Sequence, residues 1–309
     1  MIALVVRRLG WAILVAWFAA TATFAAIAAI PSDPVRAIAP HATPEVAERM
    51  RAYYCLDRGF AGQYGCFLAH LARGELGESV RAGRPVTHVI AERAWPSLQL
   101  ALAAIVLQLA VGVPLGVVAA ARRRRWPDRA TAAVTVLGQS APPFLIGTLF
   151  LYVLAYRFGW FPLGGYGSGF FDRLWHLVLP AATCAAPGVA YSARTLRSDL
   201  IDALHADYVR TARAKGLSER RIVIGHALRN ALGPLASITG LSFGLLVGGE
   251  VIAEYIFAWP GLGRELLLAV LDQDGPVIVG IVLVSALAIA LANLAVDLVQ
   301  LRLDPRLRE

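Results

Sequence analysis

Residues 97–125 read SLQLALAAIVLQLAVGVPLGVVAAARRRR, a long apolar run that ends in four consecutive arginines. One helix that crosses a bilayer core about 30 Å thick needs about 20 apolar residues. Arginine and lysine beside such a helix stay preferentially on the cytoplasmic side. This stretch therefore predicts a transmembrane helix over residues 97–121 whose carboxyl end lies in the cytoplasm.

Five further apolar runs of similar length occur elsewhere in the 309-residue chain. Hydrophobic residues make up 58% of the sequence and charged residues only 16%, whereas about a quarter of a soluble domain is charged. We therefore expect an all-α integral membrane protein with six transmembrane helices. The remaining predicted spans are residues 9–30, 131–155, 176–193, 233–255 and 276–300.

The basic residues lie beside alternate ends of these spans, which predicts that both termini are cytoplasmic. The net charge is +8, but the basic residues lie between long apolar runs and are not gathered on one polar domain. This distribution indicates membrane topology rather than nucleic-acid binding. The first run exceeds the roughly 7–15 residues of a signal-peptide core, so a retained helix is favoured over a cleaved signal. The cytoplasmic groups are Arg7 and Arg8, Arg122–Arg125 with Arg129, Arg194 through Arg229, and Arg302, Arg306 and Arg308.

Residues 31–96 form a long polar connection on the outer side, with a predicted helix from Pro44 to Tyr54. Cys55 and Cys66 lie in this connection, where an oxidising compartment permits a disulfide; two unpaired thiols remain the alternative. Neither the three cysteines nor the six scattered histidines have the spacing of a metal site, so no metal is expected.

The cytoplasmic connection over residues 198–230 has the pattern of two short helices around a turn. Val209, Ala212 and Gly216 recur at three and four residues and form a narrow apolar stripe. Gly216 suits the position after a helix, where φ is positive, and Ser218 suits the start of the next helix. A solvated loop would not need this turn chemistry, so the pattern favours a surface that docks a partner.

Gly240, Gly244 and Gly248 fall at every fourth residue of the fifth predicted span. This spacing lines one helix face and predicts close packing against another helix. Residues 240–244 also spell G-x-S-x-G around Ser242, the pattern of some serine hydrolases. That motif activates serine on a sharp strand-to-helix turn, which a continuous helix does not supply, so an intramembrane hydrolase is a distant alternative.

Glu250 and Glu254 lie near the outer end of the same span, four residues apart. An acidic side chain within a span is costly against lipid, so both carboxylates are expected on one helix face toward a translocation path. The alternative for Glu250 is an interfacial acid that is paired with an arginine, such as Arg264, or exposed to water.

Residues 210–216, RTARAKG, resemble the cytoplasmic EAA loop of ABC importer permeases, which reads E-A-A, three residues, then glycine. Arg210 and Thr211 depart from Glu-Ala, but this form is typical of the dipeptide/oligopeptide/nickel branch. Matches to that branch continue along the whole chain. They are PSDPV (31–35), GQYGCFLAHLARGELGESVRAGRPV (62–86), WPDR (126–129), GWFP (159–162), LRNALGP (228–234), EYIFAWPGLGR (254–264) and NLAVDLVQLRLDPRLR (293–308).

The resemblance implies a type I ABC importer permease architecture: a single transmembrane permease domain over residues 1–309. Residues 31–96 would be an extracytoplasmic insertion and residues 198–230 the cytoplasmic loop that couples to the ATPases. The coupling residues that the resemblance implies are Arg210, Thr211, Ala212, Arg213, Lys215, Gly216 and Leu217.

The same resemblance implies a bacterial inner-membrane assembly with a second homologous permease, forming a heterodimer, two cytoplasmic ABC ATPases and an extracytoplasmic substrate-binding protein. The chain has no G-x-x-x-x-G-K-[ST] loop, so ATP and magnesium are expected on the ATPases, with no cofactor and no catalysis in this chain. Peptides are the expected cargo, and nickel or metal chelates carried by the same mechanism are the alternative.

Overall fold

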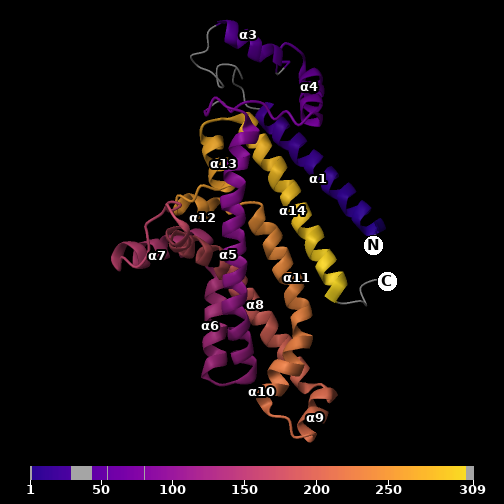
Figure 1. Ribbon diagram of the computed structural model, residues 1–309, viewed down its shortest axis with the longest axis vertical. Coiled ribbons are helices and arrows are strands. Elements are labelled where there is room, and N and C mark those ends of the chain that lie inside the picture. Colours follow the sequence, from indigo (N-terminus) through magenta and orange to yellow (C-terminus); the bar gives the residue numbers. More distant parts are fainter. Residues whose placement is uncertain (1, 29–43, 54, 80, 304–309) are drawn as a thin grey trace.

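The computed structural model describes residues 2–28, 44–53, 55–79 and 81–303, and this part of the chain is helical with only one isolated β-bridge. The molecule is elongated, with α3 and α4 at one end and α9 and α10 at the other (Figure 1). We call α3 (Pro44–Tyr53) and α4 (Phe60–Ala72) the cap, and α9 (Asp207–Ala214) and α10 (Glu219–Arg221) the tip. The PSDPV motif, Tyr54, Arg306 and Arg308 lie outside the described residues.

Five helices are long and apolar enough to cross a membrane. A sixth span is added if the two helices on either side of a sharp bend, Trp126–Ser140 and Pro143–Arg157, are counted together. The all-α membrane fold expected from the sequence is therefore confirmed. Two of the helices extend well beyond the apolar runs that predicted them, and Pro180 and Pro187 lie inside one helix without ending it. The five helices are α1 (Ile2–Ala28), α5 (Val86–Ala121), α8 (Phe170–His205), α11 (Leu228–Val247) and α14 (Gly275–Leu303).

The predicted continuous helix over residues 131–155 is wrong. It is replaced by α6 (Trp126–Ser140) and α7 (Pro143–Phe150), the second of which runs on into a π-helical stretch, η1 (Leu151–Arg157). The two halves meet at an angle of 108°. Ala141 precedes a proline and has the extended conformation that proline imposes on its predecessor, so the helix cannot continue through it.

The fifth predicted span, residues 233–255, is also interrupted. The helix observed there begins beside the tip as a second π-helical stretch, η2 (Ile222–Ala227). It continues as α11, which ends at Val247. Gly249 then takes a φ of +102°, which breaks the helix before α12 (Val251–Ile256). A further short helix, α13 (Leu262–Leu271), leads back to α14 at the cap end of the molecule (Figure 1).

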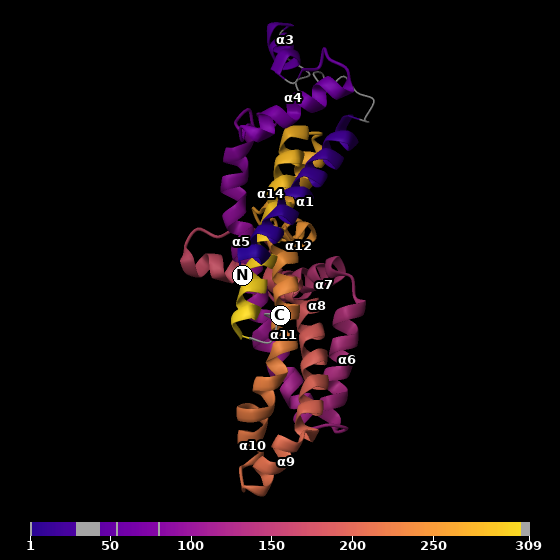
Figure 2. The same ribbon diagram turned by 90° about the vertical axis from the view of Figure 1, so that its right-hand side faces the viewer.

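α5 and α8 lie side by side through the middle of the molecule in both views (Figures 1 and 2). Between them Gln108 donates a buried hydrogen bond of 2.9 Å to Ser192, and the absence of a side chain at Gly188 leaves room for the Gln108 amide. A polar bond of this kind is favoured inside a bilayer because lipid offers its groups no other partner.

α1 packs against α14, although the two helices are far apart in the chain (Figure 1). Ala12, Ala16 and Ala20 are buried and recur every four residues, so α1 presents one face of small residues to its neighbour. Arg8 in α1 forms an ion pair of 2.7 Å with Asp297 in α14.

The cap is attached to the carboxyl-terminal part of α1 by aromatic packing. The Phe24 ring stacks on Phe67 with centroids 4.9 Å apart and also contacts Phe60 and Tyr64 of α4. The hydroxyl groups of Thr21 and Tyr64 share a hydrogen bond of 2.7 Å. These contacts orient α4 across the end of the helix bundle.

Candidate functional site

The turn of the tip has the hydrogen-bond pattern of a Schellman motif. Leu217 N–H donates to Ala212 C=O (3.3 Å) and Gly216 N–H donates to Arg213 C=O (2.9 Å). Gly216 has a φ of +79°, the left-handed conformation expected from the sequence. An added Cβ at Gly216 would meet no neighbour within 4 Å, so the glycine is needed for its backbone conformation and not for space.

Most residues expected to couple to a partner are exposed on the tip. The exposed residues are Arg210, Thr211, Arg213, Lys215 and Gly216. Ala212 departs from this pattern, because it is buried with Val209 and Ile222 in a small cluster against which Leu217 packs. Ala212 and Leu217 therefore hold the two halves of the tip together.

An ion pair crosses the turn of the tip. The Arg213 guanidinium donates to both carboxylate oxygens of Glu219, at 2.7 and 3.3 Å. The hydrogen bond to Glu219 raises the pKa of Arg213. The tip thus presents a mostly basic surface whose shape is set by local contacts.

A second ion pair fixes α8, the helix that carries the tip. Asp128 in α6 is buried and accepts hydrogen bonds from the Arg197 guanidinium, one of them at 2.9 Å, and from Arg124 N–H at 2.8 Å. Sequence reasoning did not identify this pair. The one signal was an acidic residue, Asp128, three positions after a run of four arginines.

At the cap end of the bundle, Glu254 is 0% exposed and Ser97 is 2% exposed. Ser97 Oγ donates to Glu254 Oε1 (2.6 Å), and Arg264 N–H donates to Glu254 Oε2 (2.9 Å). Ser97 Oγ also accepts a bond of 2.7 Å from Leu262 N–H. One carboxylate and one hydroxyl therefore join α5, α12 and the first turn of α13, a junction that we call the corner.

Neighbouring contacts complete the corner. Trp259 is fully buried and its indole N–H donates to Pro96 C=O at 2.9 Å. Gly165, from the connection before α8, donates its N–H to Phe257 C=O at 2.8 Å. An added Cβ at Gly261 would fall on the Glu254 carboxylate, so this glycine makes room for the acid.

Glu250 and Glu254 do not share one face of a continuous helix, because Glu250 is the residue that precedes α12. The Glu254 carboxylate is turned inward and bonded within the protein, whereas Glu250 is partly exposed. The expectation that both acids line a path therefore continues as a proposal for Glu250 alone. The alternative pairing of Glu250 with Arg264 is absent among the ion pairs of the described residues.

Two glycines of α11 and the glycine that directly follows it face α14, as their spacing predicts. An added Cβ at Gly240, Gly244 or Gly248 would meet Val296, Asn293 or Ile289, respectively. Ser242 lies inside the continuous helix α11 and not on a strand-to-helix turn. The G-x-S-x-G spelling is thus part of a helix-packing surface, and the hydrolase alternative has no geometric support.

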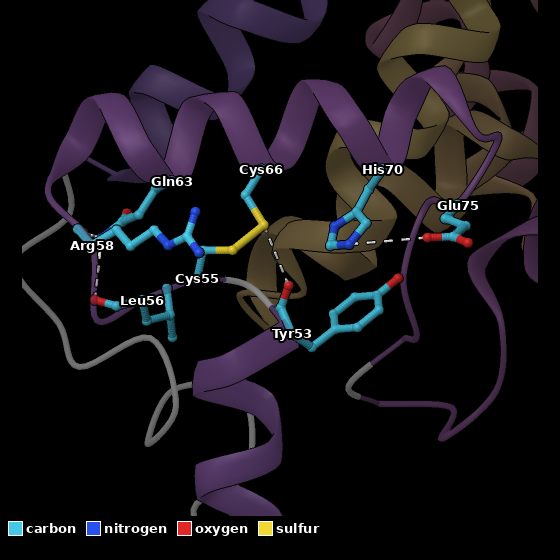
Figure 3. The surroundings of a disulfide bond; sticks show 8 residues. All are labelled: Tyr53, Cys55, Leu56, Arg58, Gln63, Cys66, His70 and Glu75. Atoms are coloured by element: carbon cyan, nitrogen blue, oxygen red, sulfur yellow. Dashed lines mark hydrogen bonds and ion pairs between the residues drawn. A yellow bond between two sulfur atoms is a disulfide. The ribbon is translucent and has the colours of Figure 1, made fainter.

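Cys55 and Cys66 are joined by a disulfide with their Cα atoms 6.3 Å apart, which closes the hairpin between α3 and α4 (Figure 3). Beside it the rings of Tyr53 and His70 stack with centroids 4.5 Å apart. Within the described residues, no group of three or more His, Cys, Asp or Glu side chains is placed to hold a metal ion.

A polar network ties the connection after the cap to the turn between α13 and α14. Ser79 Oγ donates to Asp274 (2.7 Å), and Arg81 pairs with both Glu265 and Asp272. Arg93 in α5 also pairs with Glu265, at 3.2 Å. Sequence reasoning missed these contacts because their partners are more than 170 residues apart in the chain.

Known proteins resemble this chain in both sequence and fold. The model of the family "Binding-protein-dependent transport system inner membrane component" matches residues 112–309. The glutathione transport system permease protein GsiC of Escherichia coli O6:H1 is 38% identical over 305 residues, covering 98% of each chain. Its counterpart from Salmonella choleraesuis is 39% identical over 280 residues, covering 90% of each.

The fold is also similar to a solved chain of the inward-facing MetNI methionine ABC transporter. The TM-score is 0.60 at 16% sequence identity, over 71% of this chain and 97% of that chain. At this identity the likeness shows the helical architecture alone. From the family match and the end-to-end relatives, the chain belongs to the binding-protein-dependent transport system inner membrane components, as an inner-membrane ABC importer permease of the dipeptide/oligopeptide/nickel group.

Proposed function

We propose that this permease subunit imports short peptides, including peptides of the size of glutathione. The observation that carries this proposal is the end-to-end similarity to permeases named for glutathione, a tripeptide. The assembly would contain a second permease, two ATPases and a binding protein that delivers the peptide. Nickel or metal chelates are the competing cargo, because importers of the same group carry them.

The shape and charge of the tip support the proposal that an ATPase docks on it. Its exposed cations, Arg210, Arg213 and Lys215, surround a turn whose backbone is held by two hydrogen bonds. A rigid basic projection suits an acidic groove on a soluble partner, since complementary charge speeds and orients association. We therefore place the tip in the cytoplasm and the disulfide-bonded cap outside. α1 runs toward the cap and α14 runs away from it, which would leave both termini on the cytoplasmic side (Figure 1).

Glu250 is proposed to line the translocation path. It lies where the chain breaks between α11 and α12, and its carboxylate has no hydrogen-bond or ion-pair partner within the described part of the chain. Such a group can attract the amino group of a passing peptide. Glu250→Gln should slow uptake of cationic peptides more than uptake of neutral peptides, and equal slowing of both would contradict a role in the path.

The decisive test is uptake by proteoliposomes that contain the complete importer and its binding protein. Glutathione, a neutral dipeptide and Ni²⁺ would each be supplied at the same concentration, with and without ATP. We expect ATP-dependent accumulation of at least one peptide and none of free Ni²⁺. Accumulation of Ni²⁺ without either peptide would replace the peptide assignment by the metal alternative.

A further inference from the structure

The first turn of α13 lacks a capping side chain of its own. Its N-cap residue is Gly261, and the first backbone N–H groups of any helix have no partner within the helix. Here the missing acceptors come from other elements, Ser97 Oγ for Leu262 N–H and Glu254 Oε2 for Arg264 N–H. The carboxylate also lies at the positive end of the α13 dipole. The start of α13 is therefore held by α5 and α12.

α12 lies between two points where the backbone changes direction. Gly249 precedes it with a φ of +102° and Ala258 follows it with a φ of +51°. A non-glycine residue rarely adopts this conformation, so the surrounding contacts must hold Ala258 in place. With a turn at each end, α12 can move as a short unit if the bonds at the corner are released.

The contacts that oppose this movement converge on Glu254. Glu254 reaches α5 through Ser97, and Trp259, just beyond α12, reaches the same part of α5 through Pro96 C=O. The hydrogen-bond donors to the carboxylate are a hydroxyl and a backbone amide, and no cationic side chain pairs with it among the described residues. These directional bonds, formed without an opposing charge, define one position of α12 relative to α5.

Glu250 and Cys184 connect the corner to the interior of the bundle. Glu250 directly precedes α12 and would move with it. Cys184 of α8 packs against the cluster that includes Leu100 and Trp259, the residue just beyond α12 that is anchored to α5. Displacement of α12 would therefore change both the position of Glu250 and the access of water to Cys184.

We propose that Ser97 and Glu254 form a latch that closes the translocation path at its cap end, and that the path opens when α12 and α13 separate from α5. This proposal rests on the importer function and deepens it. In these terms Glu254 is a positioning residue: it holds α12, and through α12 Glu250, without contacting the cargo.

Cys184 provides a native reporter of this latch, because it is the one free cysteine among the three in the sequence. The test measures its reaction with a small membrane-impermeant thiol reagent, added from the cap side to the full importer in proteoliposomes. Ser97→Ala removes the hydroxyl and with it the hydrogen bonds to Glu254 and Leu262. Glu254→Gln leaves one side-chain oxygen to accept from both the Ser97 hydroxyl and Arg264 N–H. We expect each variant to react at least about tenfold faster than the parent protein, as expected for the loss of a bond to a charged group.

Thr239→Ala is the matched control, because it also removes one hydroxyl, and that hydroxyl bonds only to Leu235 of its own helix. The control should react at the parent rate. Parent-like rates in both Ser97→Ala and Glu254→Gln would overturn the latch, as would equal acceleration in Thr239→Ala.

A second readout is the rate of ATP hydrolysis by the importer without its binding protein, expressed as a fraction of the rate with the binding protein. This fraction should be higher in the Ser97→Ala and Glu254→Gln variants than in the parent. If even the parent importer hydrolyses no ATP in response to its binding protein, the proposed function fails, while the labelling comparison still decides the latch.

Discussion

The tip and the corner are both short helix junctions that contain an essential glycine, yet they are stabilised in opposite ways. The bonds of the tip join residues within six positions of one another, such as Arg213 and Glu219, and its surface is exposed. The bonds of the corner join Ser97 to Glu254 and Leu262, more than 150 residues away, and are buried. The tip is thus shaped by its own sequence, whereas the corner exists only when distant helices have assembled.

The largest expected effect is that of Gly261→Ala in the corner. The new methyl group would occupy the position of the Glu254 carboxylate and displace it from Ser97. Such overpacking costs about 1–3 kcal/mol, and the broken buried bonds place this variant at the upper end of that range. Thermal unfolding in detergent should show a clearly lowered Tm. In Gly216→Ala, the same change at the tip, the methyl group meets open space and only the strain of the left-handed conformation remains, on the order of 1 kcal/mol. A loss in Gly216→Ala equal to that in Gly261→Ala would refute the distinction between the two regions.

The cap shows that a local constraint can also be strong when it is covalent. Cys55 and Cys66 are 11 positions apart and bonded, so the paired change to serine should destabilise the cap by about 2–3 kcal/mol. The remainder of the bundle should keep its stability, because α4 is attached to α1 by separate aromatic contacts. Limited proteolysis from the cap side would detect the change as faster cleavage between α3 and α4. Unchanged cleavage in the serine variant and in reduced parent protein would contradict this expectation.

Gly216→Val tests the tip by strain. A β-branched residue in the left-handed region costs on the order of 1–2 kcal/mol, and the turn should change its path to avoid that cost. We expect normal membrane insertion, but a loss of binding-protein-stimulated ATP hydrolysis and uptake in the reconstituted importer. Parent-like stimulation in Gly216→Val would show that the left-handed turn is not needed for coupling.

The smallest expected effect is that of Glu219→Gln. This change removes the charge that pairs with Arg213 on an exposed surface, where an ion pair contributes about 0.5 kcal/mol or less. Unfolding at low and high salt should therefore differ little between this variant and the parent. A salt-sensitive loss of more than about 1 kcal/mol would mean that the tip depends on its ion pair and not on its backbone turn.

The same contrast explains which features the sequence could predict. The tip turn was predictable because the conformation of Gly216 and the start of the next helix near Ser218 depend on neighbouring residues. The face formed by Gly240, Gly244 and Gly248 was predictable because helical periodicity determines it. Local rules also account for the break at Ala141, since two prolines follow it, although apolar length alone suggested a continuous span.

The corner could not be predicted from local rules. Ser97 stands at the start of an apolar run with no sign that it would contact residues 254 and 262. Glu254 was recognised as an acid within a predicted span, but the sequence could not show that its oxygens would cap α13. The pair of Asp128 and Arg197 and the pair of Arg81 and Glu265 share this property, because each depends on how two distant segments of the chain are placed.

The contact between α1 and α14 has a consequence for how the protein is made. The ribosome completes α1 long before α14 exists, so the alanine face of α1 initially meets lipid or the insertion machinery. Arg8 likewise has no Asp297 to pair with until synthesis of α14. During that interval only the apolar length of α1 keeps it in the bilayer. Arrival of the last helix therefore marks the completion of the bundle, and a nascent chain that stops before it exposes an unfilled helix face to membrane quality control.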